Sequence, residues 1–144
     1  MPPAKRPYRV LVVEDNPTDA RLVEEALSAH GVQYEMVVLP DGEEAIRHLE
    51  HITESSLPDL IILDLNIPKR DGFGVLDAYR ASAALSFVPV VILTSSDSPA
   101  DRQRARKIGV NAFLQKPMSL EEFIALGPRF KAILQADHVY PPGE

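Results

Sequence analysis

Short apolar runs alternate with amphipathic segments along most of the chain. The apolar runs cover residues 8–13, 34–39, 59–63, 89–93 and 111–114, and their short length and β-branched content predict buried strands. The intervening segments predict helices at 19–30, 43–51 and 73–81, within 97–108, and from Ser119 onward. Strands that are nearly all apolar are typical of a parallel sheet covered on both faces. The pattern therefore predicts an α/β fold, a doubly wound five-stranded parallel sheet with five helices.

The predicted helices begin and end at residues that favour those positions. Gly31 and Gly109 follow two of the helical segments, and glycine readily adopts the left-handed backbone that ends a helix. Ser119 followed by Glu122 is a capping-box pattern at the start of the last helix. Within that helix, Pro128 cannot donate a hydrogen bond to the carbonyl four residues earlier, so we predict a kink or break there.

Length and composition fit one globular domain. We expect a single domain over residues 1–144, with a core at about 8–136 and a short tail at each end. Hydrophobic residues make up 45% and charged residues 25%, and the lack of cysteine excludes disulfides and thiolate metal sites. A formal net charge of −6 disfavours nucleic-acid binding. The apolar runs are too short for a membrane span or a signal peptide, so we expect a cytoplasmic protein with no nucleic-acid or membrane partner.

Polar side chains follow four of the five predicted strands. Glu14 and Asp15 follow the first strand, Asp64 the third, Thr94 the fourth and Lys116 the fifth. Doubly wound sheets bind ligands beyond the carboxyl ends of their strands, so we expect these side chains to meet at one edge. Clustered carboxylates repel one another, and a divalent cation such as Mg²⁺, or the ammonium of Lys116, would relieve the repulsion.

This set of groups suits a phosphoryl group. Catalysis of phosphoryl transfer consists mostly of positioning and charge neutralisation, and aspartate carboxylates form aspartyl-phosphates. Each residue alone has a simpler explanation: Asp64 could cap a turn, and Glu14 and Asp15 could favour the start of the following helix. The interpretation depends on their occurrence together at the strand ends of a single sheet.

Four motifs carry a family resemblance. The stretches VLVVEDNPTDARL, IILDLNIPKRDGFGVL, VVILTSS and NAFLQKP together resemble the receiver domain of two-component response regulators, from about Val10 to the last helix. The resemblance implies a flavodoxin-like (βα)5 receiver fold with Asp64 as phosphoacceptor and Lys116 as the cation that pairs with the phosphate. It also implies a Mg²⁺ site, which Mn²⁺ could occupy instead, formed by Glu14, Asp15, Asp64 and the backbone carbonyl of Asn66.

The resemblance further implies a conformational switch beside the phosphoacceptor. Thr94 would turn its hydroxyl toward the phosphoryl oxygens, and Phe113 would move inward into the vacated space. Pro117 would follow a cis peptide bond, which only X-Pro bonds adopt at low cost. A local change of charge would thus alter a surface that another protein reads.

The resemblance also implies the partners. A sensor histidine kinase would supply the phosphoryl group, and the protein would act as a switch rather than as an enzyme. The DNPTDARL start, the long loop at 64–72 and the TSSDSPAD stretch are most similar to small single-domain regulators associated with bacterial phytochromes. The chain ends soon after the fifth predicted helix, so we expect no DNA-binding output domain and an output through protein contacts.

The last helix carries a second apolar stripe. Leu126, Phe130 and Ile133 lie on one side, and with the tail at 139–140 they could pack in a homodimer. Alternatively, the break before them turns the same residues into the core of the monomer.

Other interpretations stay open on the residues alone. A flavodoxin-like cofactor binder would need a hydroxyl- and glycine-rich loop after the first strand, where this chain has Glu14-Asp15-Asn16-Pro17. A phosphatase of the haloacid dehalogenase type would need an acid at position 66, where this chain has Asn66, and a serine hydrolase would need a G-x-S-x-G turn. His48 and His51 could bind a metal, but a solvated helix surface explains them more simply.

Overall fold

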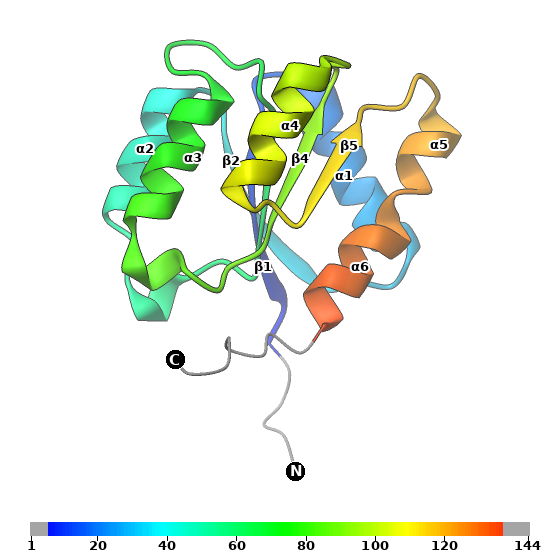
Figure 1. Ribbon diagram of the computed structural model, residues 1–144. Helices are drawn as coiled ribbons and strands as arrows, with labels where there is room; N and C mark the ends of the chain where they lie inside the picture. The colour runs from blue at the N-terminus through cyan, green and yellow to red at the C-terminus, as the bar shows by residue number, and fades with distance from the viewer. Residues whose placement is uncertain (1–5, 137–144) are drawn as a thin grey trace.

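A five-stranded parallel sheet lies at the centre of the computed structural model, which describes residues 6–136 (Figure 1). The strands are β1 (Tyr8–Val13), β2 (Tyr34–Leu39), β3 (Leu60–Leu63), β4 (Val90–Thr94) and β5 (Ala112–Gln115). The helices are α1 (Pro17–Ala29), α2 (Gly42–Glu50), α3 (Gly72–Ala81), α4 (Pro99–Ile108), α5 (Leu120–Ile124) and α6 (Gly127–Gln135). Two single 3₁₀ turns are η1 (Glu54–Ser56) and η2 (Ala83–Leu85). The order β2-β1-β3-β4-β5 confirms the predicted doubly wound fold.

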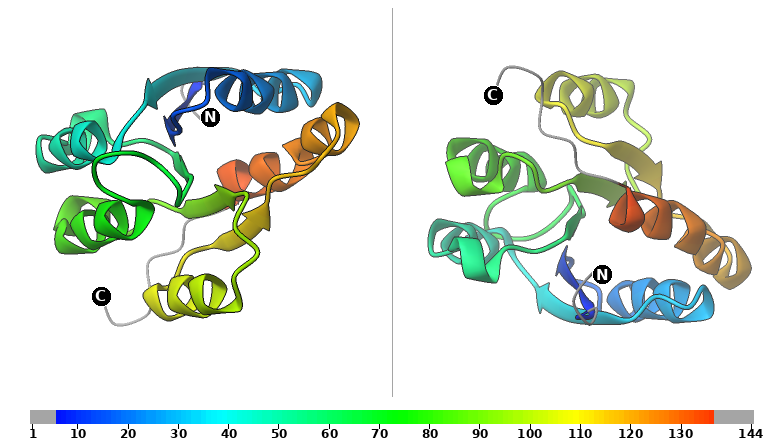
Figure 2. Two further views of the ribbon diagram at one scale, coloured as in Figure 1. Left: turned by 90° about the horizontal axis from the view of Figure 1, so that it is seen from above. Right: turned by 90° about the horizontal axis from the view of Figure 1, so that it is seen from below.

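Alternate residues of the central strands face two separate apolar layers. Leu11 and Ile61 contribute to a cluster with side chains of α2, α3 and α4, whereas Val12 and Ile62 pack with those of α1, α5 and α6. Figure 2 shows the two sets of helices on opposite sides of the sheet. Burial on both faces explains why the sequences of β1, β3 and β4 are nearly all apolar.

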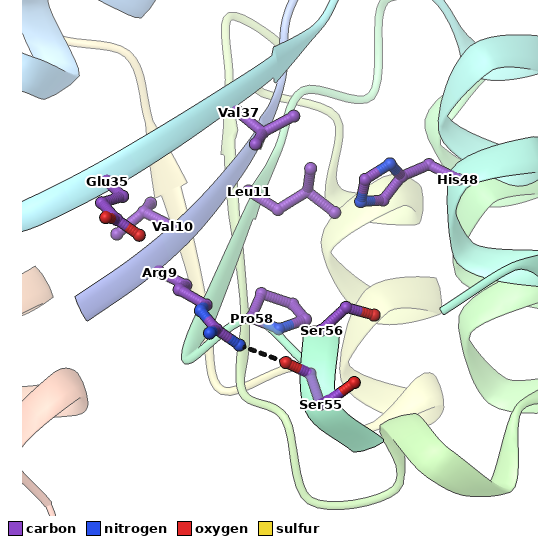
Figure 3. A pocket seen from close by; sticks show the side chains of 9 residues that line it. All are labelled: Arg9, Val10, Leu11, Glu35, Val37, His48, Ser55, Ser56 and Pro58. Carbon is purple, nitrogen blue, oxygen red and sulfur yellow. Dashed lines mark hydrogen bonds between the residues drawn. The ribbon is translucent and has the colours of Figure 1, made fainter. Parts of the chain in front are cut away.

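Strand β2 departs from the prediction that all strands are covered on both faces. It lies at the edge of the sheet and, within residues 6–136, pairs with β1 alone. Val37 and Val38 are 47% and 41% exposed, so an apolar sequence here did not indicate burial. Between β2, α2 and η1 lies a cavity of about 320 Å³, lined by Val37, His48 and Arg9 among others (Figure 3).

This cavity is remote from the predicted site, because Arg9 and Glu35 lie near the amino ends of their strands. His48 lines it, whereas His51 is exposed and its Nδ1 lies 2.8 Å from the Arg47 carbonyl oxygen. The only cluster of potential metal ligands in the described part of the chain contains neither histidine.

Capping residues define several of the helix ends, including those predicted at Gly31, Gly109 and Ser119. Asn16 caps α1 by accepting from the amides of Thr18 and Asp19, so α1 begins at Pro17, two residues before the predicted start. Gly31 and Gly109 have φ angles of 73° and 94°, the left-handed conformation expected after a helix. Ser119 accepts from the amide of Glu122 and caps α5.

The predicted break at Pro128 is confirmed and separates α5 from α6. It turns Phe130 into the core layer beneath α1, where the ring is fully buried. The expectation that Phe130 lies at a dimer face is therefore wrong, since a residue enclosed by its own fold cannot reach a second copy. Leu126 and Ile133 are partly buried against the same layer. Residues 139–140 lie outside the described part of the chain.

Close packing of α6 on α1 depends on Gly127. A Cβ atom there would collide with the Ala26 carbonyl oxygen and the His30 ring. We expect Gly127→Ala to lower the free energy of unfolding by about 1–3 kcal/mol, because backbone and ring must both shift. Gly74→Ala is the matched control: its Cβ would lie 3.3 Å from the flexible end of Arg70, and alanine favours a helix. Urea unfolding of both variants checks the difference, and equal midpoints would contradict it.

Candidate functional site

The carboxyl ends of β1, β3, β4 and β5 bring the predicted polar residues together. The parallel register places Val13 beside Leu63, so Glu14 and Asp64 are neighbours where β1 and β3 end. Lys116 follows β5, and its amide donates to the carbonyl of Thr94 at the end of β4. Glu14, Asp64 and Thr94 are buried, which sets them apart from ordinary turn residues.

Three carboxylates form a group that could hold a metal ion. Glu14, Asp15 and Asp64 each offer one oxygen, and these oxygens lie within 4.8 Å of one another. Asp15 is exposed, whereas the other two are buried. Hard oxygen donors of this kind fit Mg²⁺, which commonly uses one or two carboxylates and keeps several waters.

Lys116 brings a positive charge to the same group. Its ammonium nitrogen lies 2.7 Å from Glu14 Oε1, 2.8 Å from Asp64 Oδ2 and 2.8 Å from Asp19 Oδ2. The sequence analysis did not identify Asp19 as a site residue. The helix start at Asn16-Pro17 could have indicated this role, because it puts Asp19 in the first turn of α1, close to the strand ends.

Burial and charge act in opposite directions on the ionisation of these groups. Burial raises the pKa of Glu14 to about 7, and the nearby charge of Asp64 adds to this, although the hydrogen bond from Lys116 opposes it. Burial alone would lower the pKa of Lys116, but its hydrogen bonds with Asp19, Asp64 and Glu14 outweigh burial and raise it. Lys116 is therefore a permanent cation, whereas Glu14 gains a proton near neutral pH.

Thr94 and Asn66 lie beside the carboxylates. The amide of Asn66 donates to Asp64 Oδ1 at 3.0 Å, and its side-chain nitrogen lies 3.5 Å from the Thr94 hydroxyl. The amide of Ser96 also donates to that hydroxyl, at 3.3 Å. Asn66 thus orients Asp64 through its backbone amide and Thr94 through its side-chain amide. Its side chain offers no carboxylic acid.

Phe113 on β5 is half-buried and contacts a cation of α4. The Arg102 guanidinium lies 4.7 Å from the centroid of the ring. The ring packs against the apolar layer under α2, α3 and α4. The ring therefore lies between the core and the surface.

The predicted cis bond before Pro117 is wrong. All peptide bonds of the described residues are trans, including that between Lys116 and Pro117. The trans form is the lower-energy state of an ordinary X-Pro bond, by about 0.5–1 kcal/mol.

Across residues 6–136, no helix has the length and hydropathy needed to cross a membrane.

Comparison with known proteins connects this geometry to a family. The family model of the response regulator receiver domain matches residues 10–126. The response regulator Rcp1 of Synechocystis sp. is 37% identical over 123 residues, which are 83% of this chain and 84% of Rcp1.

Solved structures give the same result. The phosphorylated cyanobacterial phytochrome response regulator RcpA has a TM-score of 0.82 at 33% identity, covering 96% of this chain and 100% of that one. The Mn²⁺-bound form of Rcp1 has a TM-score of 0.80 at 34% identity, covering 95% and 100%. The receiver domain of a Pseudomonas aeruginosa sensor histidine kinase, with magnesium in its active-site cleft, has a TM-score of 0.67 at 29% identity, covering 86% and 97%. With its strand-end acidic cluster, lysine and buried threonine, this chain belongs to the receiver domain family of two-component response regulators.

Proposed function

We propose that the protein is a phosphorylation-dependent signalling switch whose phosphoryl group is carried by Asp64. The observation that carries the proposal is a buried carboxylate oriented on both oxygens. Asp64 Oδ1 accepts from the Asn66 amide, and Oδ2 lies 2.8 Å from the Lys116 ammonium. A partner histidine kinase would supply the phosphoryl group, and the similarity to RcpA and Rcp1 favours a kinase of the phytochrome type.

The chemistry follows from the neighbours of Asp64. A carboxylate oxygen attacks the phosphorus of a phosphohistidine, so a P–O bond forms while the P–N bond breaks and the histidine nitrogen regains its lone pair. Lys116 neutralises the charge of the entering group. Mg²⁺ held by Glu14, Asp15, Asp64 and the carbonyl of Asn66 would supply further charge neutralisation.

The switch uses Thr94 and Phe113. Thr94 Oγ would turn from Asn66 and the Ser96 amide toward the phosphoryl oxygens. The space that it leaves would accept the Phe113 ring, which would change the contact with Arg102 on the surface of α4. A charge change at the strand ends would thereby alter a protein-binding surface.

Several broader proposals follow from the family. We assign residues 1–144 to one receiver domain with its core at 8–136, supported by a match over 84% of Rcp1. We place it in the cytoplasm, where phosphate donors and magnesium occur together.

Because the side chain at position 66 is an amide rather than an acid, we propose that the phosphoryl group persists on Asp64 and that the protein does not turn over a pool of substrate. Homodimerisation stays a prediction, limited to Leu126, the residue before α6, and Ile133 within it. Sedimentation as a monomer at micromolar concentration would contradict it.

The proposal is tested by the metal dependence of phosphorylation. Incubation with acetyl phosphate and Mg²⁺ should add the mass of one phosphoryl group to the intact protein, and chelation of the metal should prevent this. Beryllofluoride with Mg²⁺ should shift the amide resonances of Thr94 and Phe113. Modification that proceeds equally in excess chelator would contradict the proposed site.

The raised pKa of Glu14 predicts a pH dependence of metal binding. A protonated carboxyl is neutral and a poor Mg²⁺ ligand, so affinity should be full above the pKa of about 7 and fall as the pH drops below it. The loss should approach about tenfold per pH unit, since one proton competes with one metal ion. Calorimetric titration with MgCl₂ between pH 6 and pH 8.5 measures it. Glu14→Gln should bind more weakly and lose this slope; an unchanged slope would assign the proton to another group.

A further inference from the structure

Asp19 occupies a distinct position among the three partners of Lys116. The ammonium has three N–H donors, and three carboxylates lie within 2.8 Å of its nitrogen. Glu14 and Asp64 also belong to the cluster that could hold a metal ion, whereas Asp19 lies outside that cluster. A bound divalent cation would therefore share Glu14 and Asp64 with the ammonium, and Asp19 is the partner of Lys116 that lies outside that cluster.

The local structure holds Asp19 in place. Its amide donates to the Asn16 side chain in the first turn of α1, and a helix amino terminus stabilises a carboxylate. The Asp19 side chain is 21% exposed, against 5% for those of Glu14 and Asp64. Asp19 thus contacts Lys116 from the rim of the site, whereas Glu14 and Asp64 contact it from the buried part.

We propose that Asp19 is a positioning residue that anchors the Lys116 ammonium at the rim of the site. With this anchor, Glu14 and Asp64 can turn to a metal ion without displacing Lys116, which stays within reach of a phosphoryl group on Asp64. Without it, the ammonium depends on the two carboxylates that the metal needs, and the two cations exclude each other more strongly. The inference rests on the proposed function and adds a side chain from α1 to the phosphorylation site.

The first test is a double-mutant cycle on Mg²⁺ affinity, measured by calorimetric titration. Asp19→Asn should weaken Mg²⁺ binding about tenfold, as expected for the loss of one charge-assisted hydrogen bond. In a Lys116→Met background, the same change should have less than about a twofold effect, because no ammonium is left to anchor. An equal weakening in both backgrounds would mean that Asp19 acts directly on the metal and would overturn the inference.

Two controls separate this role from general effects. Glu25→Gln removes one carboxylate from the exposed face of the same helix and should leave Mg²⁺ affinity unchanged. Asp19→Ser, checked with Asp19→Asn for an unaltered melting temperature, gives a second variant should one fold poorly.

A second test is spectroscopic. The Nζ resonance of Lys116 in Mg²⁺-bound protein should broaden or shift in both Asp19 variants, and an unchanged signal would contradict the anchor. If the wild type binds no Mg²⁺ and accepts no phosphoryl group, the proposed function itself fails, whereas a normal wild type with normal Asp19 variants overturns the anchor alone.

Discussion

Asp64→Asn is expected to reduce phosphorylation by acetyl phosphate at least about a hundredfold, because an amide oxygen cannot act as the nucleophile. The asparagine has nearly the same shape and can still receive the amide hydrogen bond from Asn66. The variant should therefore fold normally while losing the acceptor. Transfer of radiolabelled phosphate, counted after gel filtration, measures the loss.

The matched control for this variant is Asp77→Asn, which removes an exposed carboxylate from α3. It should be labelled at the wild-type rate. If Asp64→Asn is labelled as fast as the control, the phosphoacceptor lies elsewhere and the account of the site is wrong.

Lys116→Met should cause the largest loss of stability at the site, about 3–5 kcal/mol in the absence of metal. Methionine fills much of the same volume, but it leaves Glu14 and Asp64 buried without their cation. Millimolar MgCl₂ should restore much of this stability and should stabilise the variant more than the wild type, because the ion replaces the missing charge. Denaturant unfolding at pH 8, with and without Mg²⁺, measures both effects.

Lys107→Met serves as the control, since Lys107 is an exposed cation in the last turn of α4. It should cost little stability and show no added response to Mg²⁺. A Lys116→Met protein within about 1 kcal/mol of the wild type would mean that Lys116 does not compensate buried charge.

Much of the fold could be predicted because its strands are buried on both faces. The apolar runs gave β1 and β2 with the observed boundaries, and the turn and cap residues located most helix ends within two residues. The edge strand was harder to predict, because Val37 and Val38 look like core residues in the sequence but are exposed in the structure. Burial depends on strand order, which local patterning does not contain.

The part of the candidate site that could be predicted is the set of residues at the carboxyl ends of the strands. Glu14, Asp64, Thr94 and Lys116 meet because parallel strands end at one edge. Asp19 was missed because it reaches the site from a helix, through a contact 97 residues apart in sequence. Phe130 illustrates the opposite limit, since a stripe shared by a dimer face and a core has the same spacing in both cases.

Lys116 and a bound metal ion would share two carboxylates of this site, those of Glu14 and Asp64. Lys116, whose side chain is 11% exposed, contacts both members of the buried pair of Glu14 and Asp64. A divalent ion and an incoming phosphoryl group then bring charges of opposite sign to the same place. This complementarity of charge supports the proposal that the site binds a metal ion and a phosphoryl group together.

The location of the phosphoryl group tests the central claim most directly. The protein is treated with acetyl phosphate and Mg²⁺, reduced with borohydride, which converts an aspartyl-phosphate to homoserine, and analysed by peptide mass spectrometry. The account predicts homoserine at position 64 alone. Homoserine at position 15 or 19, or an acid-labile phosphate on His48 or His51, would contradict it.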